Sequence, residues 1–171
     1  GSICMHQSIL GDHTTSSMIA TNDSGKPIVW LTGCSSPCLS LYKPVVFGEV
    51  IPPVFEDENE SLDYWLKREY LHRAVFSGLI DKDAFVAKRD FLQEEFIKEA
   101  SALINLSVND RNFSSFSRRC FEKEEAWIEE YREAIEAIKN NEAKLSGVWK
   151  KKNKRLGRYV FSKDLKVRMK S

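Results

Sequence analysis

Few side chains in this chain of 171 residues can act as nucleophiles or as acid–base groups near neutral pH. The candidates are three histidines and four cysteines: His6, His13, His72, Cys4, Cys34, Cys38 and Cys120. The chain also has no glycine-rich phosphate loop, His-Glu-x-x-His or Cys-x-x-Cys motif, so spacing alone assigns no catalytic residue.

Cys34 and Cys38 lie close together in a loop that contains serine and proline. Their spacing leaves three alternatives open: free thiols, a disulfide or a metal site. A zinc site would need a second close pair or nearby histidines, and neither follows at a suitable spacing. We therefore predict no metal and no cofactor, and free thiols are the state that suits a reducing cytoplasm.

Length and composition predict a globular protein of about one domain. Hydrophobic residues make up 42% and charged residues 30%, which argues against disorder of the whole chain. No apolar run approaches the roughly 18 residues of a membrane-spanning helix. The net charge is +1, but residues 147–171 hold ten basic residues against one acid, which gives +9 there and −8 elsewhere. Such a basic segment is a solvated tail, pairs with acidic helices, or binds nucleic acid.

The N-terminal part of the chain has strand composition. Three short apolar runs are bounded by turn-forming residues, at 3–6, 14–20 and 28–32. Asn, Asp and Gly between residues 22 and 27 predict a hairpin turn. The small hydroxyl side chains at 14–17 predict a strand that lies at the surface or lines a polar pocket.

Apolar residues then recur with helical spacing in three segments, which predict helices at about 62–76, 81–105 and 113–144. Ser61 is the expected N-cap of the first helix, and Gly78 its expected end. Asp81 can cap the second helix. The second and third helices are long enough to form an antiparallel hairpin. Gly147 is expected to end the helical region, with a short strand or a docking segment starting at Val148.

A polar cluster is predicted on the first helix, from Arg68, Glu69, His72 and Arg73. These side chains could point together into a functional site. The simpler interpretation is a partly buried helix in which Glu69 and Arg73 form an i,i+4 ion pair.

Several short motifs occur in a fixed order along the first half of the chain: Cys4-Met5-His6, Thr14-Thr15-Ser16-Ser17-Met18, Trp30-Leu31-Thr32-Gly33 and Leu41-Tyr42-Lys43-Pro44-Val45-Val46-Phe47. The first predicted helix adds a Trp-x-x-Arg-x-x-x-His-Arg pattern at Trp65, Arg68, Glu69, His72 and Arg73. The ordered set resembles the C-terminal half of the secernin and cysteine-dipeptidase family, which belongs to the N-terminal nucleophile (Ntn) hydrolases. The resemblance covers about the first 75 residues.

The resemblance implies an αββα sandwich and a reaction in which a terminal cysteine thiolate attacks an amide carbonyl, with its own α-amino group as the base. Nothing in this chain matches the nucleophile segment, so the implied partner is an N-terminal fragment of the same protein that carries the cysteine, or a self-associated form. The implied substrate is a small peptide or amide. His6, Thr14 and Thr15 would line the pocket on central strands, as positioning residues and not as catalysts.

We therefore predict an α+β chain in which short antiparallel strands (1–47) precede a helical layer (61–145) and a basic segment (148–171). It is a single domain or the C-terminal part of one. The leading hypothesis is the C-terminal portion of a cytoplasmic cysteine amidohydrolase or dipeptidase. One alternative is a non-catalytic interaction module with the same fold, and another is a basic-tailed nucleic-acid binder, which would lose affinity steeply with salt.

Overall fold

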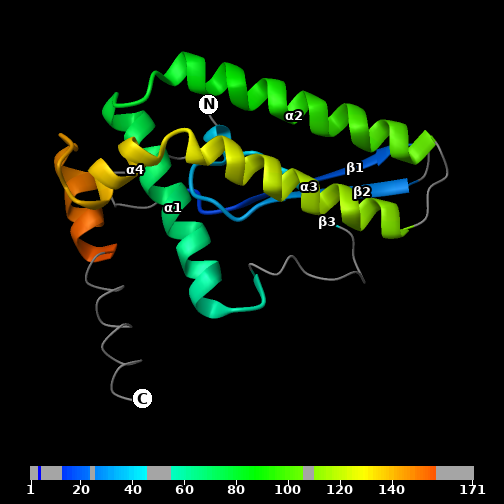
Figure 1. Cartoon of the computed structure of the whole chain (residues 1–171), viewed down its shortest axis with the longest axis horizontal. Helices are drawn as coiled ribbons and strands as arrows, with labels where there is room; N and C mark the ends of the chain where they lie inside the picture. The colour runs from blue at the N-terminus through cyan, green and yellow to red at the C-terminus, as the bar shows by residue number, and fades with distance from the viewer. Residues whose placement is uncertain (1–3, 5–12, 24–25, 46–54, 106–109, 157–171) are drawn as a thin grey trace.

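The computed structural model describes residues 4, 13–23, 26–45, 55–105 and 110–156, and their fold is α+β (Figure 1). The elements in chain order are β1 (Ser17–Asp23), β2 (Lys26–Thr32), the 3₁₀ helix η1 (Pro37–Leu39), β3 (Lys43–Val45), α1 (Glu58–Ser77), α2 (Lys82–Asn105), α3 (Asp110–Glu129) and α4 (Arg132–Lys139). Residues 147–156 are also helical. The prediction of antiparallel strands followed by long helices is confirmed at this level.

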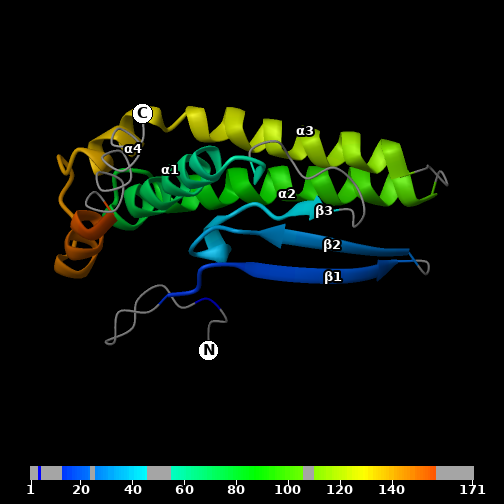
Figure 2. The same cartoon turned by 90° about the horizontal axis from the view of Figure 1, so that it is seen from below.

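The strands form an antiparallel sheet in the order β1-β2-β3. The β1–β2 register runs from Ser17 opposite Thr32 to Asp23 opposite Lys26, which confirms the predicted hairpin. The predicted strand at 3–6 lies outside the described residues, apart from Cys4. β1 is the strand farthest from α2 and α3 (Figure 2).

Helix α1 begins earlier than the sequence predicts, and the predicted cap at Ser61 is wrong. The cap is Asp57, whose Oδ1 accepts hydrogen bonds from the backbone N–H groups of Asn59 (2.8 Å) and Glu60 (3.0 Å). Acidic residues in the first turn also stabilise the helix, because their negative charges lie near the positive end of its dipole. The predicted end is confirmed, because Gly78 adopts a left-handed φ of 80° and bonds back to the last turn.

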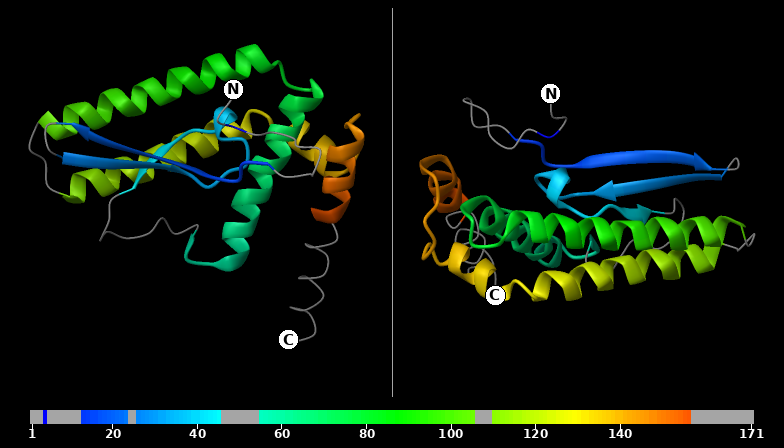
Figure 3. Two further views of the ribbon diagram at one scale, coloured as in Figure 1. Left: turned by 180° about the vertical axis from the view of Figure 1, so that it is seen from behind. Right: turned by 90° about the horizontal axis from the view of Figure 1, so that it is seen from above.

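Helices α2 and α3 form the predicted antiparallel hairpin (Figures 1 and 3). The Asp81 carboxylate accepts from the N–H of Ala84 at 2.7 Å, which confirms the cap of α2. The third predicted helix is divided: α3 ends at Glu129 and α4 begins at Arg132. The change of direction lets α4 pack against α1, where Ile135 is buried.

The prediction that Gly147 ends the helical region is wrong, because residues 147–156 form a further helix. Trp149 and Asn153, one helical turn apart, are both buried. Trp149 stacks on Phe76 of α1 with ring centroids 5.9 Å apart. This helix is therefore docked on α1 by its apolar side.

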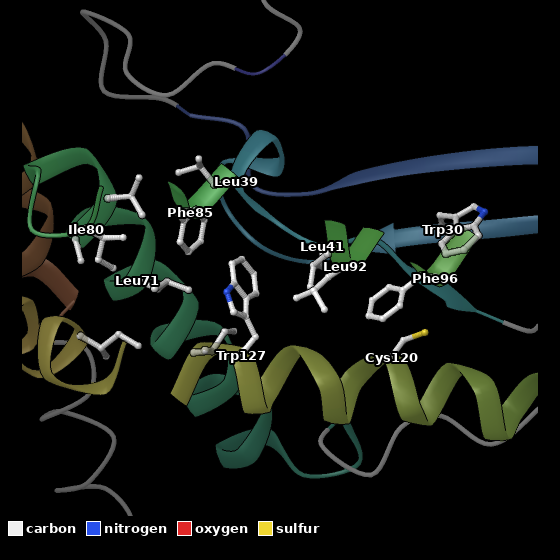
Figure 4. Packing of buried hydrophobic residues seen from close by; sticks show 14 of the residues in the cluster. Trp30, Leu39, Leu41, Leu71, Ile80, Phe85, Leu92, Phe96, Cys120 and Trp127 are labelled. Atoms are coloured by element: carbon white, nitrogen blue, oxygen red, sulfur yellow. The ribbon is translucent and has the colours of Figure 1, made fainter. Parts of the chain in front are cut away.

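The hydrophobic core lies between the sheet and the helices (Figure 4). Phe85 of α2 and Trp127 of α3 are in contact, with ring centroids 4.7 Å apart. Leu39 and Leu41, from the segment between β2 and β3, are almost fully buried against them. The loop that follows β2 is thus part of the core and fixes the sheet to the helical hairpin.

The left-handed residue at the end of α1 gives a direct test of the fold. Gly78→Ala should lower the free energy of unfolding by about 1 kcal/mol, because a Cβ at this φ is strained even though the space around it is open. Urea unfolding followed by circular dichroism measures this. Gly147→Ala is the matched control, since its φ is not left-handed and its surroundings are also open. Equal destabilisation of both variants would contradict the argument.

Candidate functional site

The carboxylate of Glu124 on α3 is almost fully buried, yet it carries a charge. Its Oε1 accepts from Lys43 Nζ of β3 at 2.5 Å. Its Oε2 accepts from Arg68 of α1 at 2.6 Å and 3.1 Å, and from the Tyr64 hydroxyl at 2.7 Å. Side chains of Lys43, Arg68 and Glu124 are each only 2% exposed. Side chains of β3 and α1 therefore meet at a carboxylate of α3.

The electrostatics of this cluster keep Glu124 ionised. Burial by itself would raise the pKa of Glu124, but the charges of Arg68 and Lys43 outweigh it and lower this pKa to about 2. Burial and the neighbouring Glu124 raise the pKa of Tyr64. The Arg68 guanidinium also lies over the Tyr64 ring, 3.2 Å from its centroid. Glu124 is therefore ionised and Tyr64 protonated near neutral pH, and we assign the cluster a structural role.

His72 lies beside the hydroxyl group of Ser40, as a general base lies beside its nucleophile in some enzymes, but both residues are buried. Its Nε2 lies 3.5 Å from Ser40 Oγ. Burial lowers the pKa of His72 to about 3 and outweighs the opposing effect of the Ser35 backbone, and the charge of Arg68 adds a smaller lowering. The imidazole is thus neutral and only 4% exposed, while its neighbour Ser40 lines the groove between the β1–β2 hairpin and α2.

Glu69 and Arg73 form the predicted i,i+4 ion pair, at 3.0 Å. The pair is more deeply buried than the sequence indicated, with both side chains at most 3% exposed. Arg73 also donates to the side-chain oxygen of Asn153 in the last helix. Together with Arg68 and His72, these residues bind neighbouring elements of the fold and do not face solvent.

Three of the thiols, those of Cys34, Cys38 and Cys120, are poor nucleophiles. The structure holds Cys34 and Cys38 as free thiols. Burial raises the pKa of Cys34. Burial, and then contact with the Cys4 thiol, raises the pKa of Cys38 to about 11. Burial, with a contribution from Glu99, raises the pKa of Cys120 to about 12. Each is therefore protonated at neutral pH, and a thiolate is the reactive form.

An elongated apolar groove lies between the β1–β2 hairpin and α2, with a volume of about 470 Å³. Trp30 and Ile28 form its floor, and Ile97 its rim. On the α2 side the lining extends from Arg89 to Ile104, which is about 22 Å at the helical rise per residue. The mainly apolar lining suits an extended apolar ligand or segment.

One wall of the groove is fixed by an unusual contact. The Gln93 amide accepts from the backbone N–H of Tyr42 at 2.8 Å and donates to the carbonyl of the same residue at 3.2 Å. Arg89, at the end of the groove, donates to the Cys38 carbonyl and pairs with Asp90 at 2.6 Å. Side chains of α2 therefore hold the loop that precedes β3.

The opposite face of the sheet is apolar and largely open. By the strand register, this face carries Met18, Ala20, Val29, Leu31 and Val45. Met18 is 64% exposed, and none of the others is fully buried. Lys43 is on the same face but is covered where it reaches α3. An exposed apolar sheet face of this kind is usually covered by another layer.

Of the predicted pocket residues, His6 lies outside the described part of the chain. Thr14 is half-buried, and its carbonyl accepts from the N–H of Ser36 at 3.1 Å. Thr15 is exposed. Neither threonine lines the groove. The sequence did not predict the groove, although Ile97, which lines it, is an apolar residue outside the buried stripe of α2.

The structure brings His13 to the last helix, a contact that the sequence did not predict. Its Nε2 is 3.0 Å from Ser35 Oγ, and its Nδ1 is 2.9 Å from Lys152 Nζ. The basic run leaves exposed charges on the outside of this helix, at Lys150, Lys151, Lys154 and Arg155. Trp149, which the nucleic-acid hypothesis needs for base stacking, is instead buried against α1. Tyr159 and Phe161 lie outside the described residues.

Comparison of the chain with protein-family models, with curated proteins and with solved structures finds no match. Within the described residues, no helix combines the length and apolar character needed to span a membrane. The same residues contain no grouping of His, Cys, Asp and Glu side chains that could bind a metal ion.

Removal of the buried charge of Glu124 should lower the free energy of unfolding far more than removal of the charge of the neighbouring Glu125. Glu124→Gln leaves Lys43 and Arg68 buried without a counter-charge, so we expect a loss of about 3–5 kcal/mol in unfolding free energy. Glu125→Gln is the matched control: that side chain is 48% exposed, and its loss should cost less than about 1 kcal/mol. Tyr64→Phe, which removes one bond to the carboxylate, gives a milder test if Glu124→Gln does not fold. Equal losses for Glu124→Gln and Glu125→Gln in urea unfolding would contradict the assignment.

The ionised carboxylate of Glu124 should also make the stability of the fold depend on pH in the acid range. The pKa of Glu124 is about 2 in the folded chain and about 4.3 in an unfolded chain, so ionisation stabilises the fold above about pH 4. That contribution, about 3 kcal/mol, is lost as the pH falls toward 2. Unfolding free energies measured between pH 7 and pH 2 should therefore fall less steeply for Glu124→Gln than for the native chain. Parallel curves would rule out Glu124 as the source.

Proposed function

We propose that this chain is the C-terminal portion of a cysteine amidohydrolase or dipeptidase of the Ntn-hydrolase type, whose nucleophile lies on a segment outside this chain. The ordered motifs supply the family hypothesis. The observation that carries it further is the apolar sheet face at Met18, Ala20 and Leu31, which is open while α2 lies along the other face. A half-sandwich that lacks its second sheet would leave such a face uncovered.

The state of the thiols supports a nucleophile from elsewhere. The thiols of Cys34, Cys38 and Cys120 all have raised pKa values, and two of them are buried. In the proposed reaction the α-amino group of the terminal cysteine takes the thiol proton, the thiolate attacks the amide carbonyl carbon, the C–N bond breaks, and the amine leaves with the proton that the α-ammonium group returns. Water then cleaves the thioester and releases the acid.

The residues of this chain would support that reaction and not perform it. The cluster around Glu124 fixes β3 to α1 and α3, so the sheet that receives the completing segment is held rigidly. The groove beside Trp30 and Ile97 would accept an apolar side chain of the substrate. Trp65, Arg68, His72 and Arg73 of the motif helix are packed inside the fold, which suits positioning and not catalysis.

The test is the intact mass of every polypeptide that co-purifies with this chain from its natural source, followed by assay of the purified species on dipeptides. We expect a second polypeptide that begins with cysteine, and dipeptide hydrolysis that iodoacetamide abolishes. Cys38→Ser in this chain should keep the activity, because that thiol is protonated and is not the nucleophile.

The substitution Met18→Lys tests whether the second polypeptide binds at the open sheet face. It places a charge on the open face, so it should release the second polypeptide while the chain remains folded, and Ala126→Lys on exposed α3 surface is its control. A chain that purifies without such a polypeptide and hydrolyses nothing would overturn the proposal. That outcome would favour the non-catalytic interaction module, which needs the same surface but no nucleophile.

A further inference from the structure

The free edge of β1 is a second surface, distinct from the open sheet face. Among the described residues, β1 pairs only with β2, and it lies on the side of the sheet away from the helices (Figure 2). Half of its backbone N–H and C=O groups therefore point away from β2. An edge of this kind binds another extended strand, since only a strand matches the spacing of those groups.

The sequence of β1 lacks the usual protection against such pairing. Edge strands are commonly blocked by lysine, proline, a bulge or an inward-pointing charge. From Ser17 to Asn22 the strand contains no charged residue and no proline, and its pairing with β2 is regular, without a bulge. Met18 and Ile19 are 64% and 46% exposed. Among the described residues, the edge is thus unpaired, regular and partly apolar.

We propose that β1 pairs antiparallel with β1 of a second copy of this chain, about a twofold axis at Ala20. This register makes the strand complementary to itself. Ala20 lies opposite Ala20, where the small side chain allows the two copies to approach closely. Ile19 lies opposite Thr21, and Met18 lies opposite Asn22, so no like charges face each other between Ser17 and Asn22.

The same register explains the groove beside α2. Residues directly opposite each other in antiparallel strands share a face, so Ile19 of the second copy would lie beside Thr21, above the groove. Thr21, Ile97 and Ser101 line the groove at this point, and Ile97 is 49% exposed. Each copy would then cover part of the groove of the other with its Ile19. A seven-residue strand spans roughly 23 Å, which is close to the length of the groove.

A second copy fits this edge better than an unrelated strand does. The groove needs an apolar residue one position away from the centre of the incoming strand, and β1 supplies Ile19 at that position. It also needs a strand that is already extended and free on one edge, and β1 has both properties. The pairing would join two three-stranded sheets into a continuous six-stranded sheet, with an α2 helix along the same face in each half.

The test uses the purified full chain in sedimentation velocity and native mass spectrometry over a range of concentrations. The native chain should form a dimer of twice 19.7 kDa. Ala20→Lys and Ala20→Glu should each weaken the dimer about tenfold or more, because they place like charges directly opposite each other. An equimolar mixture of these two variants should dimerise again, since opposite charges then meet at the axis.

The charge-swap mixture separates this proposal from the proposed function and from misfolding. Only a contact between residue 20 of one copy and residue 20 of another predicts rescue by mixing. Ala126→Lys, which adds the same charge on exposed α3 surface, should dimerise as the native chain does. A native chain that stays monomeric, an Ala20→Lys variant that dimerises normally, or a mixture that does not recover would each overturn the proposal. A dimer that forms without any cysteine-bearing partner would support it and leave the hydrolase to its own test, because the open sheet face is a different surface.

Discussion

The arrangement of this fold depends on one carboxylate. Glu124 accepts hydrogen bonds from a lysine on β3 and from an arginine and a tyrosine on α1, and so joins a strand to two helices that are otherwise connected by long stretches of chain. The cost of burying an ion pair is usually large, and here it is offset by hydrogen bonds to both carboxylate oxygens. The main effect of these ion pairs is to specify where β3 and α1 lie, because a shift of either element would leave a charge buried without a partner.

Local signals in the sequence were sufficient for much of the secondary structure. The residues at 22–27 predicted the hairpin, Gly78 predicted the end of α1, and Asp81 predicted the start of α2, since each acts through backbone geometry within a few residues. Ser61 was a misleading cap because Asp57 offers the same chemistry one turn earlier. The break between α3 and α4 had no comparable signal, as it arises from the packing of α4 on α1.

The candidate site was less predictable, because it is formed by residues far apart in the sequence. Lys43 and Glu124 are separated by 81 positions, and nothing near either residue indicates the other. Histidine and cysteine were sensible first candidates by residue type, but burial makes His72 neutral and keeps the thiols of Cys34 and Cys120 protonated. The groove and the open sheet face are properties of register and layer order. They become visible only when β1, β2 and α2 are placed together.

The two edges of the sheet differ in a way that limits how the protein can assemble. Beside β3, helix side chains take the place of a neighbouring strand: Gln93 satisfies both backbone groups of Tyr42, and the Ser117 hydroxyl donates to the Pro44 carbonyl at 2.5 Å. A sheet with two open edges can extend without limit into a filament. Among the described residues, side chains of α2 and α3 occupy part of the β3 edge, so the pairing proposed at β1 would end at a closed complex of two copies.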